Sequence, residues 1–327
     1  MKILVVGGAG YIGSHMVKML GLSGYDVVVL DSLEKGYQDA VLYGELIVGD
    51  LADRQLLEQL FSDHSFDGVM HFASYIEVGE SVANPSRYYR NNVSNTQNLL
   101  DAMVEHSVNN FVFSSTAAIF GEPEYSPINE SHSKKPINPY GKSKFMVEQM
   151  LADYDKAYGL KSVALRYFNA AGADPEGELG ERHNPESHLI PLVLQAASGR
   201  REAISVFGSD YDTPDGTCVR DYIHINDLCD AHLLALAELR ETGQSERYNL
   251  GNGLGFSVKQ VIDTAIKVTN QKINVIQSER RPGDPAILVA DANKARDKLK
   301  WQPKFDQLEQ IIQTAWQWEQ SFFTTGR

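Results

Sequence analysis

The sequence contains very few cysteines. Only Cys218 and Cys229 occur among its 327 residues, which is too few for a disulfide framework. Neither stands in a CxxC pair or a recognisable cluster of metal ligands, so the sequence predicts no metal site. This sparing use of cysteine is typical of proteins in a reducing compartment.

Long apolar runs and an excess of positive charge are also missing. The apolar run at residues 3–6 is too short for a signal peptide, and no uncharged run of about 18 apolar residues follows. The chain carries 30 Lys and Arg against 43 Asp and Glu, a formal charge of −13. This balance argues against nucleic acid or an anionic membrane as the main partner. We therefore expect a soluble, cytoplasmic protein that holds phosphate-bearing ligands through local arginines and backbone donors.

The first 31 residues have the pattern of a strand, a glycine turn, a helix and a second strand. The apolar run at 3–6 leads into G-G-A-G-Y-I-G at 7–13, and the second run at 27–30 ends at Asp31. The glycines allow the backbone to approach a pyrophosphate, and the helix N-terminus attracts it. Asp31 can accept hydrogen bonds from two ribose hydroxyls. Its charge favours NAD over NADP, although Lys35 nearby leaves some room for NADP.

Strand and helix patterns continue to alternate after this unit. Further strands are expected at 46–48, 69–73, 111–113 and 163–169, with helices around 56–60, 85–106 and 140–154 between them. Such alternation predicts a doubly wound parallel sheet of the Rossmann type, with ligands at the carboxyl ends of its strands. A stretch rich in Pro, Gly, acidic residues and His at 173–188 has no periodicity and marks the change to a second region.

The second region is expected to mix short strands and helices. Helices are expected near 188–198, 227–239 and 257–269, strands at 204–207 and 248–250, and two more helices at the end. The predicted fold is therefore α/β, with a doubly wound parallel Rossmann sheet and a smaller mixed α/β substrate-binding domain. We place the NAD-binding domain at 1–169, with 222–251 returning to it, and the substrate-binding region at 170–327.

Tyr140 and Lys144 form the most informative pair in the sequence. They stand four residues apart at the start of an expected helix, so both side chains lie on one face. A neighbouring ammonium favours the phenolate and brings a tyrosine towards the range of a useful base. The alternative is a half-buried ring beside a solvated charge, which is common on amphipathic helices. Arg220 and Arg281 likewise allow a structural and a functional interpretation. Each arginine either forms a surface ion pair or helps to bind a pyrophosphate.

Several segments together resemble the extended short-chain dehydrogenase/reductase superfamily and, within it, the UDP-glucose 4-epimerase family. The superfamily pattern consists of the glycine turn, F-S-S-T at 113–116 and Y-x-x-x-K at 140–144. The narrower resemblance lies in L-R-Y-F-N at 165–169, S-H-L-I-P at 187–191, D-G-T-C-V-R-D-Y-I-H at 215–224 and R-R-P-G-D at 280–284. It covers essentially the whole chain, and the stretch at 215–224 is its most specific part.

This resemblance implies roles for individual residues. It makes Tyr140 the catalytic base, Lys144 the residue that lowers the tyrosine pKa and binds the nicotinamide ribose, and Thr116 the partner of the reacting sugar oxygen. Residues implied to line the NAD site are Gly7, Gly10, Tyr11, Ile12, Gly13, Asp31, Asp50, Leu51, Phe72, Ala73, Asn92, Ser114, Tyr140, Lys144 and Tyr167. Residues implied to contact the UDP-sugar are Thr116, Tyr140, Asn169, His188, Leu189, Ser205, Phe207, Arg220, Arg281, Asp284 and Leu288.

The implied reaction inverts C4 of a UDP-hexose and interconverts UDP-galactose and UDP-glucose. Tyr140 takes the proton of the 4-hydroxyl while NAD⁺ accepts hydride from C4, and the 4-keto sugar turns over before hydride returns to its opposite face. No net oxidation occurs, so NAD is expected to stay bound. The resemblance also implies a homodimer built from the helix near 85–106 and the helix that begins at Tyr140.

Other activities are weighed against this one. A sugar-nucleotide dehydratase of the same fold has an Asp-Glu pair where this chain has Ala117 and Ala118, so it lacks the acid and base for elimination. Leu288 occupies the position that gates the sugar pocket in the family. Its intermediate size leaves 4-epimerisation of UDP-N-acetylhexosamines open, and pentose or uronate substrates also remain possible. A non-catalytic NAD-binding protein would not need Thr116, Tyr140 and Lys144 together.

Overall fold

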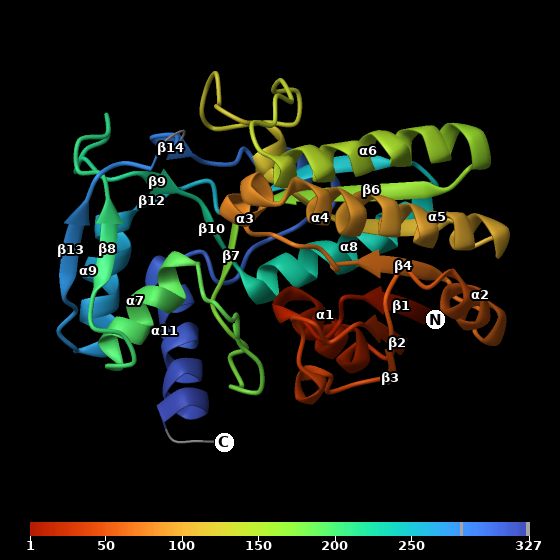
Figure 1. The fold of residues 1–327 in the computed structure, drawn as a ribbon, viewed down its shortest axis with the longest axis horizontal. Helices are drawn as coiled ribbons and strands as arrows, with labels where there is room; N and C mark the ends of the chain where they lie inside the picture. Colours follow the sequence, from red (N-terminus) through yellow and green to blue (C-terminus); the bar gives the residue numbers. More distant parts are fainter. Residues whose placement is uncertain (282–283, 325–327) are drawn as a thin grey trace.

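The computed structural model describes residues 1–281 and 284–324, and its largest element is a seven-stranded sheet (Figure 1). The strand order is β11-β6-β5-β4-β1-β2-β3, and each neighbouring pair is parallel. The strands are β1 (Lys2–Val6), β2 (Asp26–Asp31), β3 (Glu45–Val48), β4 (Gly68–His71), β5 (Asn110–Thr116), β6 (Lys161–Tyr167) and β11 (Glu246–Leu250). This is the Rossmann strand order with one strand added at the edge, and it confirms the predicted fold class.

Helices cover both faces of the sheet. The layer on one face consists of α1 (Tyr11–Leu22), α8 (Ile225–Thr242) and α10 (Asn293–Lys298), and the layer on the other consists of α2 (Arg54–Asp63), α5 (Asn95–Glu105) and α6 (Pro139–Tyr158). Successive residues of a strand point to opposite faces. In β1, Ile3 and Val5 therefore pack in the first layer, and Leu4 and Val6 pack in the second. Burial on both faces explains why these strands are continuously apolar.

The helix expected near 85–106 is present but interrupted. It consists of α4 (Pro85–Tyr89), a π-helical turn η2 (Arg90–Ser94) and α5, and a short helix α3 (Val78–Ala83) precedes it. The sequence did not predict α3 or the π turn. Asn92 lies in this turn and bonds both backbone groups of Tyr75, at 3.0 Å each. The turn thus ties the loop after β4 to the helix layer.

The second region is built from three small sheets and a group of helices (Figure 1). The sheets pair β8 with β13, β7 with β10, and β9 with both β12 and β14. Helices α7, α9 and α11 share one apolar core with residues of β8. The elements of this region are β7 (Asn169–Ala171), α7 (Leu189–Ala197), β8 (Ile204–Phe207), β9 (Val219–Arg220), β10 (Tyr222–His224), β12 (Phe256–Ser257), α9 (Val258–Thr269), β13 (Val275–Ser278), β14 (Ile287–Leu288), α11 (Leu308–Trp318) and the π-helical turn η4 (Glu319–Thr324). Two short 3-10 turns, η1 (Gln38–Ala40) and η3 (Ala117–Ile119), belong to the first region.

The chain crosses between the two regions more than once. After β10, helix α8 packs on the Rossmann sheet and β11 pairs with β6 in parallel. The segment at 222–251 therefore supplies a helix and a strand to the first region, while the exact domain limits stay a prediction. Cys218 and Cys229 are buried and free. Within the described residues, no helix is both long and apolar enough to cross a bilayer.

Candidate active site

A cavity of about 540 Å³ opens where the Rossmann strands end and meets the second region. Its volume is in the range of small-molecule sites. The phenol of Tyr11 at the start of α1 donates a hydrogen bond to the carbonyl of Gly172 at 2.7 Å, which joins the two regions at the cavity wall. The predicted site residues that line the cavity are Gly7, Gly10, Tyr11, Ile12, Gly13, Asp31, Asp50, Leu51, Phe72, Ala73, Ser114, Thr116, Tyr140, Lys144, Tyr167, Asn169, His188, Arg220, Asp284 and Leu288.

The glycine turn forms one end of this cavity, and its glycines are required for different reasons. Gly7 has φ +80°, and a Cβ there would lie 2.5 Å from the backbone nitrogen of Ala73. A Cβ on Gly13 would lie 2.1 Å from the carbonyl oxygen of Gly7, so the helix could not approach the turn. Gly10 precedes α1, and no side chain caps that helix. The N-terminal N–H groups and positive dipole end are thus left for an anion such as a pyrophosphate.

Asp31 ends β2 beside the glycine turn. Its two carboxylate oxygens accept hydrogen bonds from the backbone N–H groups of Ala9 and Leu33, each at 2.9 Å. Burial raises the pKa of this carboxyl, and the two N–H donors oppose the rise. Each oxygen retains a lone pair for a hydroxyl group. Asp31 is therefore fixed in the orientation needed to bind a ribose diol.

Tyr140 lies in the first turn of α6 and lines the same cavity. Asn138 caps this helix, since its side-chain oxygen accepts from the N–H of Gly141 at 2.8 Å. A Cβ on Gly141 would lie 2.5 Å from the carbonyl oxygen of Ala118, so only glycine allows the helix to begin this close to the end of β5. The close approach places the phenol of Tyr140 near Thr116, and both residues line the cavity.

The electrostatics of the pair differ from the expectation drawn from the sequence. Burial raises the pKa of Tyr140, and the hydrogen bond from Thr116 opposes the rise. Lys144 is 2% exposed, and burial lowers its pKa to about 7. Its Nζ donates to the carbonyl of Ser114 at 2.8 Å rather than to the phenol. In the chain alone, Lys144 therefore anchors the helix, and Thr116 is the group that favours the phenolate.

The far end of the cavity carries the predicted substrate contacts. Arg220 lines it and forms an ion pair with Asp284, and the side-chain amide of Asn169 donates to the carbonyl of Asp221 at 2.7 Å. Leu288 lines the same end and packs against a small cluster that includes Phe120. These residues come from strands β7, β9 and β14, so the second region supplies this end.

Five predicted site residues do not line the cavity. Asn92 is 1% exposed, and its side chain is used by Tyr75 and by Ser143, whose Oγ is 3.1 Å from Nδ2. The guanidinium of Arg281 stacks 4.0 Å above the ring of Phe207, close to the cavity end but outside its lining. The others are Phe207, Leu189 and Ser205. The neighbouring Pro282 and Gly283 of the R-R-P-G-D motif lie outside the described residues.

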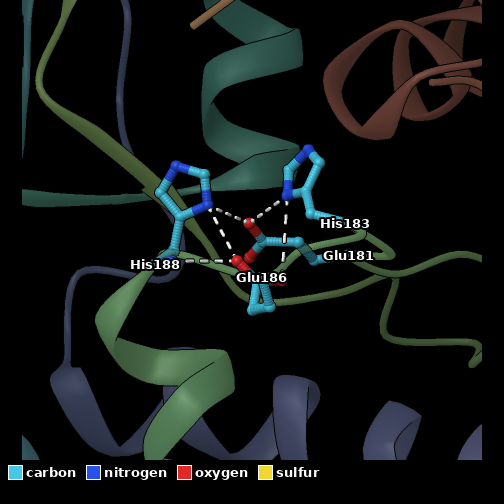
Figure 2. A group of neighbouring side chains, drawn as sticks. All are labelled: Glu181, His183, Glu186 and His188. Atoms are coloured by element: carbon cyan, nitrogen blue, oxygen red, sulfur yellow. Dashed lines mark hydrogen bonds and ion pairs between the residues drawn. The ribbon is translucent and has the colours of Figure 1, made fainter. Parts of the chain in front are cut away.

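The structure also brings together a group that the sequence reading missed. Glu181, His183, Glu186 and His188 converge from the loop between β7 and α7 (Figure 2). Both carboxylates lie against the imidazoles, which raises the pKa of His183 to about 9 and that of His188 to about 10. Only His188 was singled out from the sequence. The sequence signal that could have found this group is the pattern E-x-H-x-x-E-x-H at 181–188. Because this stretch has no helix or strand periodicity, its spacing does not show which side chains lie together.

Comparison with known proteins gives a consistent result along the whole chain. Residues 3–251 match the profile of the NAD dependent epimerase/dehydratase family. The chain is 54% identical over 318 residues to a UDP-glucose 4-epimerase of Halalkalibacterium halodurans, covering 97% of this chain and 95% of that protein.

Solved structures agree with this. A UDP-glucose 4-epimerase of Brucella ovis in complex with NAD superposes with a TM-score of 0.94 at 48% identity, over 96% of this chain and 97% of that one. A UDP-Glc/GlcNAc 4-epimerase of Campylobacter jejuni superposes with a TM-score of 0.86 at 45% identity, over 98% and 99% of the two chains.

Proposed function

The chain belongs to the NAD dependent epimerase/dehydratase family, and we propose that it inverts C4 of a UDP-hexose, converting UDP-galactose to UDP-glucose by way of a transient 4-keto sugar. It is then an isomerase that depends on bound NAD. The observation that carries this function is that Tyr140 and Thr116 line the same cavity as the glycine turn and Asp31. A phenol and a hydroxyl beside one open space can hold the same sugar oxygen, as proton acceptor and as orienting partner.

The residues at the other end of the cavity fit NAD. The backbone cradle at Gly7 and Gly13 has no room for a Cβ, the start of α1 has no side-chain cap, and Asp31 presents a fixed carboxylate. NAD supplies the hydride acceptor and donor for C4 of the sugar. A 2′-phosphate would face the carboxylate of Asp31, and this repulsion supports NAD as the cofactor.

Tyr140 moves the proton in this proposal. Its phenol takes the proton of the 4-hydroxyl as C4 is oxidised and returns it when the 4-keto sugar is reduced. The contact with Thr116 stabilises the phenolate that is needed for the first step. The Nζ of Lys144 donates to the carbonyl of Ser114, and Lys144 lines the cavity. Its ammonium can therefore contact the ribose of a cofactor bound in that cavity. Its charge then favours the phenolate as well.

The second region anchors the nucleotide while the hexose turns. Arg220 lies at the cavity end with 13% of its side chain exposed, and it would offer a guanidinium to a diphosphate. Arg281 over Phe207 lies just beyond it. Inversion requires the sugar to present both of its faces to one cofactor. The protein must therefore bind the diphosphate tightly and the hexose only loosely.

The dehydratase alternative lacks its catalytic groups. Ala117 and Ala118 line the cavity directly after Thr116, and neither can donate or accept a proton. An epimerase acting on UDP-N-acetylhexosamines is the second candidate. It is supported by Leu288, which is smaller than an aromatic gate, and by the likeness to the Campylobacter jejuni UDP-Glc/GlcNAc 4-epimerase. 4-Epimerisation of UDP-pentoses or UDP-uronates would be the same reaction on a different sugar.

We also propose that the protein is a homodimer, because adjacent surface helices carry exposed apolar side chains. Helices α3, α4 and α6 lie side by side at the surface (Figure 1), and Val78, Val82 and Met146 on them are 46%, 63% and 41% exposed. Exposed apolar side chains on adjacent helices are suited to a subunit interface. The cytoplasmic location expected from the composition stays a prediction.

The function is tested by incubating the purified protein with UDP-galactose, UDP-N-acetylgalactosamine and UDP-arabinose without added NAD. Formation of UDP-glucose from UDP-galactose is expected, because the cofactor remains bound. UDP-galactose should be converted fastest. Comparable rates with the N-acetylated substrate would establish the second candidate, and no conversion of any of the three, with NAD present in the protein, would refute 4-epimerisation.

A further inference from the structure

We propose that Glu181, His183, Glu186 and His188 form a binding site for one structural Zn²⁺ ion at the wall of the active-site cavity. The four side chains come from eight consecutive residues and point their ligand atoms toward one centre (Figure 2). Two imidazoles and two carboxylates are a donor set that Zn²⁺ accepts readily. The proposal concerns metal binding and is independent of the proposed epimerisation.

The spacing of the donor atoms matches a tetrahedral ion. Bonds of about 2.0–2.1 Å to Zn²⁺ place neighbouring ligand atoms about 3.3–3.4 Å apart. The Nδ1 atom of His183 lies 3.0 Å from Glu181 and 3.8 Å from Glu186, and that of His188 lies 2.8 Å and 3.1 Å from the same two carboxylates. These nitrogen–oxygen distances, which involve both oxygens of Glu186, differ from the tetrahedral edge by roughly half an ångström or less, and the ligand atoms of all four residues lie within 4.8 Å of one another. Shifts of that size would bring the four atoms around one ion.

Both carboxylates are buried, and that of Glu186 is also held by the backbone before any ion binds. Each has only 6% of its side chain exposed. One oxygen of Glu186 accepts the backbone N–H groups of Ser187 and His188 at 2.8 and 2.9 Å. Such supporting contacts orient metal ligands and raise affinity. The charges also balance, since two carboxylates neutralise a divalent ion.

A second group of carboxylates in this chain has its centre occupied by a lysine side chain. Asp174, Glu176 and Glu178 also lie close enough together to hold an ion. Their centre is occupied by Nζ of Lys18, at 2.8, 2.5 and 2.7 Å from the three carboxylates. Around the Glu181 group the described ion pairs are those with the two histidines themselves. The imidazoles of His183 and His188 can each release the proton on Nδ1 and ligate a metal through that atom, so Zn²⁺ binding would release protons. The ammonium of Lys18 is itself the cation that its three carboxylates bind.

The location indicates a structural role. Glu181, His183 and His188 line the active-site cavity, and Glu181, His183 and Glu186 also line a smaller cavity of about 70 Å³ behind it. Four protein ligands leave no open position for a catalytic water. The ion would fix the loop that separates these cavities. With Nδ1 of His188 bound to the metal, its Nε2 retains the proton and can donate a hydrogen bond.

The site is tested by measuring metal content and Zn²⁺ affinity on the full chain after dialysis against a chelator. One Zn²⁺ per chain is expected to rebind, and Co²⁺ should give the intense visible absorption of a tetrahedral N/O site. His183→Gln and Glu186→Gln should each weaken Zn²⁺ binding at least 10-fold. Glu176→Gln is the matched control in the Lys18 cluster and should bind Zn²⁺ as the wild type does.

Two results would overturn the proposal. One is the absence of stoichiometric Zn²⁺ binding and of the Co²⁺ spectrum in the wild-type chain, a result that does not depend on any variant folding. The other is unchanged affinity in His183→Gln and Glu186→Gln. NAD content and UDP-galactose conversion, measured on the same samples, show separately whether the proposed function holds.

Discussion

The Nζ atom of Lys144 lies 2.8 Å from the carbonyl oxygen of Ser114, which joins helix α6 to strand β5. The next contact along the same two elements is that of Tyr140 with Thr116. Four residues of helix rise about 6 Å, and two residues of strand rise about 6.6 Å. The Tyr-x-x-x-Lys spacing on the helix therefore matches the Ser-x-Thr spacing on the strand, and this match positions the phenol.

Replacing Lys144 by Met removes the Nζ contact while keeping most of the buried volume. We expect Lys144→Met to lose NAD on purification and to lower UDP-galactose turnover by at least 100-fold, because both the helix anchor and the cationic partner of the phenolate are removed. Cofactor absorbance and turnover measure this. Lys142→Met, exposed on the same helix, should behave as the wild type, and equal NAD content in both variants would count against the assigned role.

Arg220 is the proposed anchor of the diphosphate. Arg220→Met should raise the Kd for UDP by about 10- to 100-fold, because a charge-assisted contact contributes about 1.5–3 kcal/mol. Its NAD content should not change, since Arg220 lies at the far end of the cavity from the glycine turn. Isothermal titration with UDP measures the effect. Arg201→Met, at an exposed arginine of the second region, is the control, and an unchanged UDP affinity in Arg220→Met would exclude the anchor.

Leu288 sets the size of the sugar pocket in this account. Leu288→Ala enlarges the cavity wall and should raise the ratio of UDP-N-acetylgalactosamine to UDP-galactose conversion by about 10-fold, since the fit of one substituent is worth about 1–3 kcal/mol. Competition between the two substrates measures the ratio. Ile287→Ala, at the adjacent and 37% exposed residue, should leave it unchanged. A ratio that moves equally in both variants would argue against a gate at Leu288.

A buried ion pair holds α6 against the sheet below the site. Glu148 on the helix accepts from Nε of Arg166 on β6 at 2.9 Å and from the hydroxyl of Ser115 on β5 at 2.6 Å. Both side chains of the pair are 2% exposed. Glu148→Gln leaves the guanidinium unpaired, and we expect a loss of about 3–5 kcal/mol in the free energy of unfolding.

Denaturation in urea, followed by far-UV circular dichroism, measures this loss. Glu124→Gln is the matched control, because its partner Lys135 is 72% exposed and the carboxylate lies at the surface. Its unfolding midpoint should equal that of the wild type. A Glu148→Gln chain as stable as this control would mean that the pair does not hold the helix.

The sequence predicts the fold well, for local reasons, and the structure gathers most of the residues expected to hold the cofactor around one cavity. Strands buried on both faces are recognisable as continuously apolar runs. The close backbone contacts of the glycine turn allow only one conformation, so Gly7, Gly13 and Asp31 could be placed from their spacing alone. Tyr140 and Thr116 were matched by resemblance, and the structure adds the glycine contact at Gly141 that lets them meet.

Features that depend on irregular backbone could not be predicted in the same way. Asn92 was expected to face the cofactor, but the π turn directs its side chain to Tyr75 and Ser143 inside the protein. Glu181 and His183 lie in a loop without periodicity, where sequence patterns do not say which side chains converge. The lowered pKa of Lys144 follows from the burial of its Nζ, and the contact of that Nζ with the carbonyl of Ser114 is one that sequence spacing does not reveal.

The central claim, that Tyr140 moves the proton of the sugar 4-hydroxyl, is tested most directly by the rate at which Tyr140→Phe, purified with its cofactor, converts UDP-galactose to UDP-glucose. The account predicts that the variant retains NAD to the same extent as the wild type and loses about 10²- to 10⁴-fold in rate, the usual contribution of a general base. Conversion at the wild-type rate by the NAD-loaded variant would contradict it.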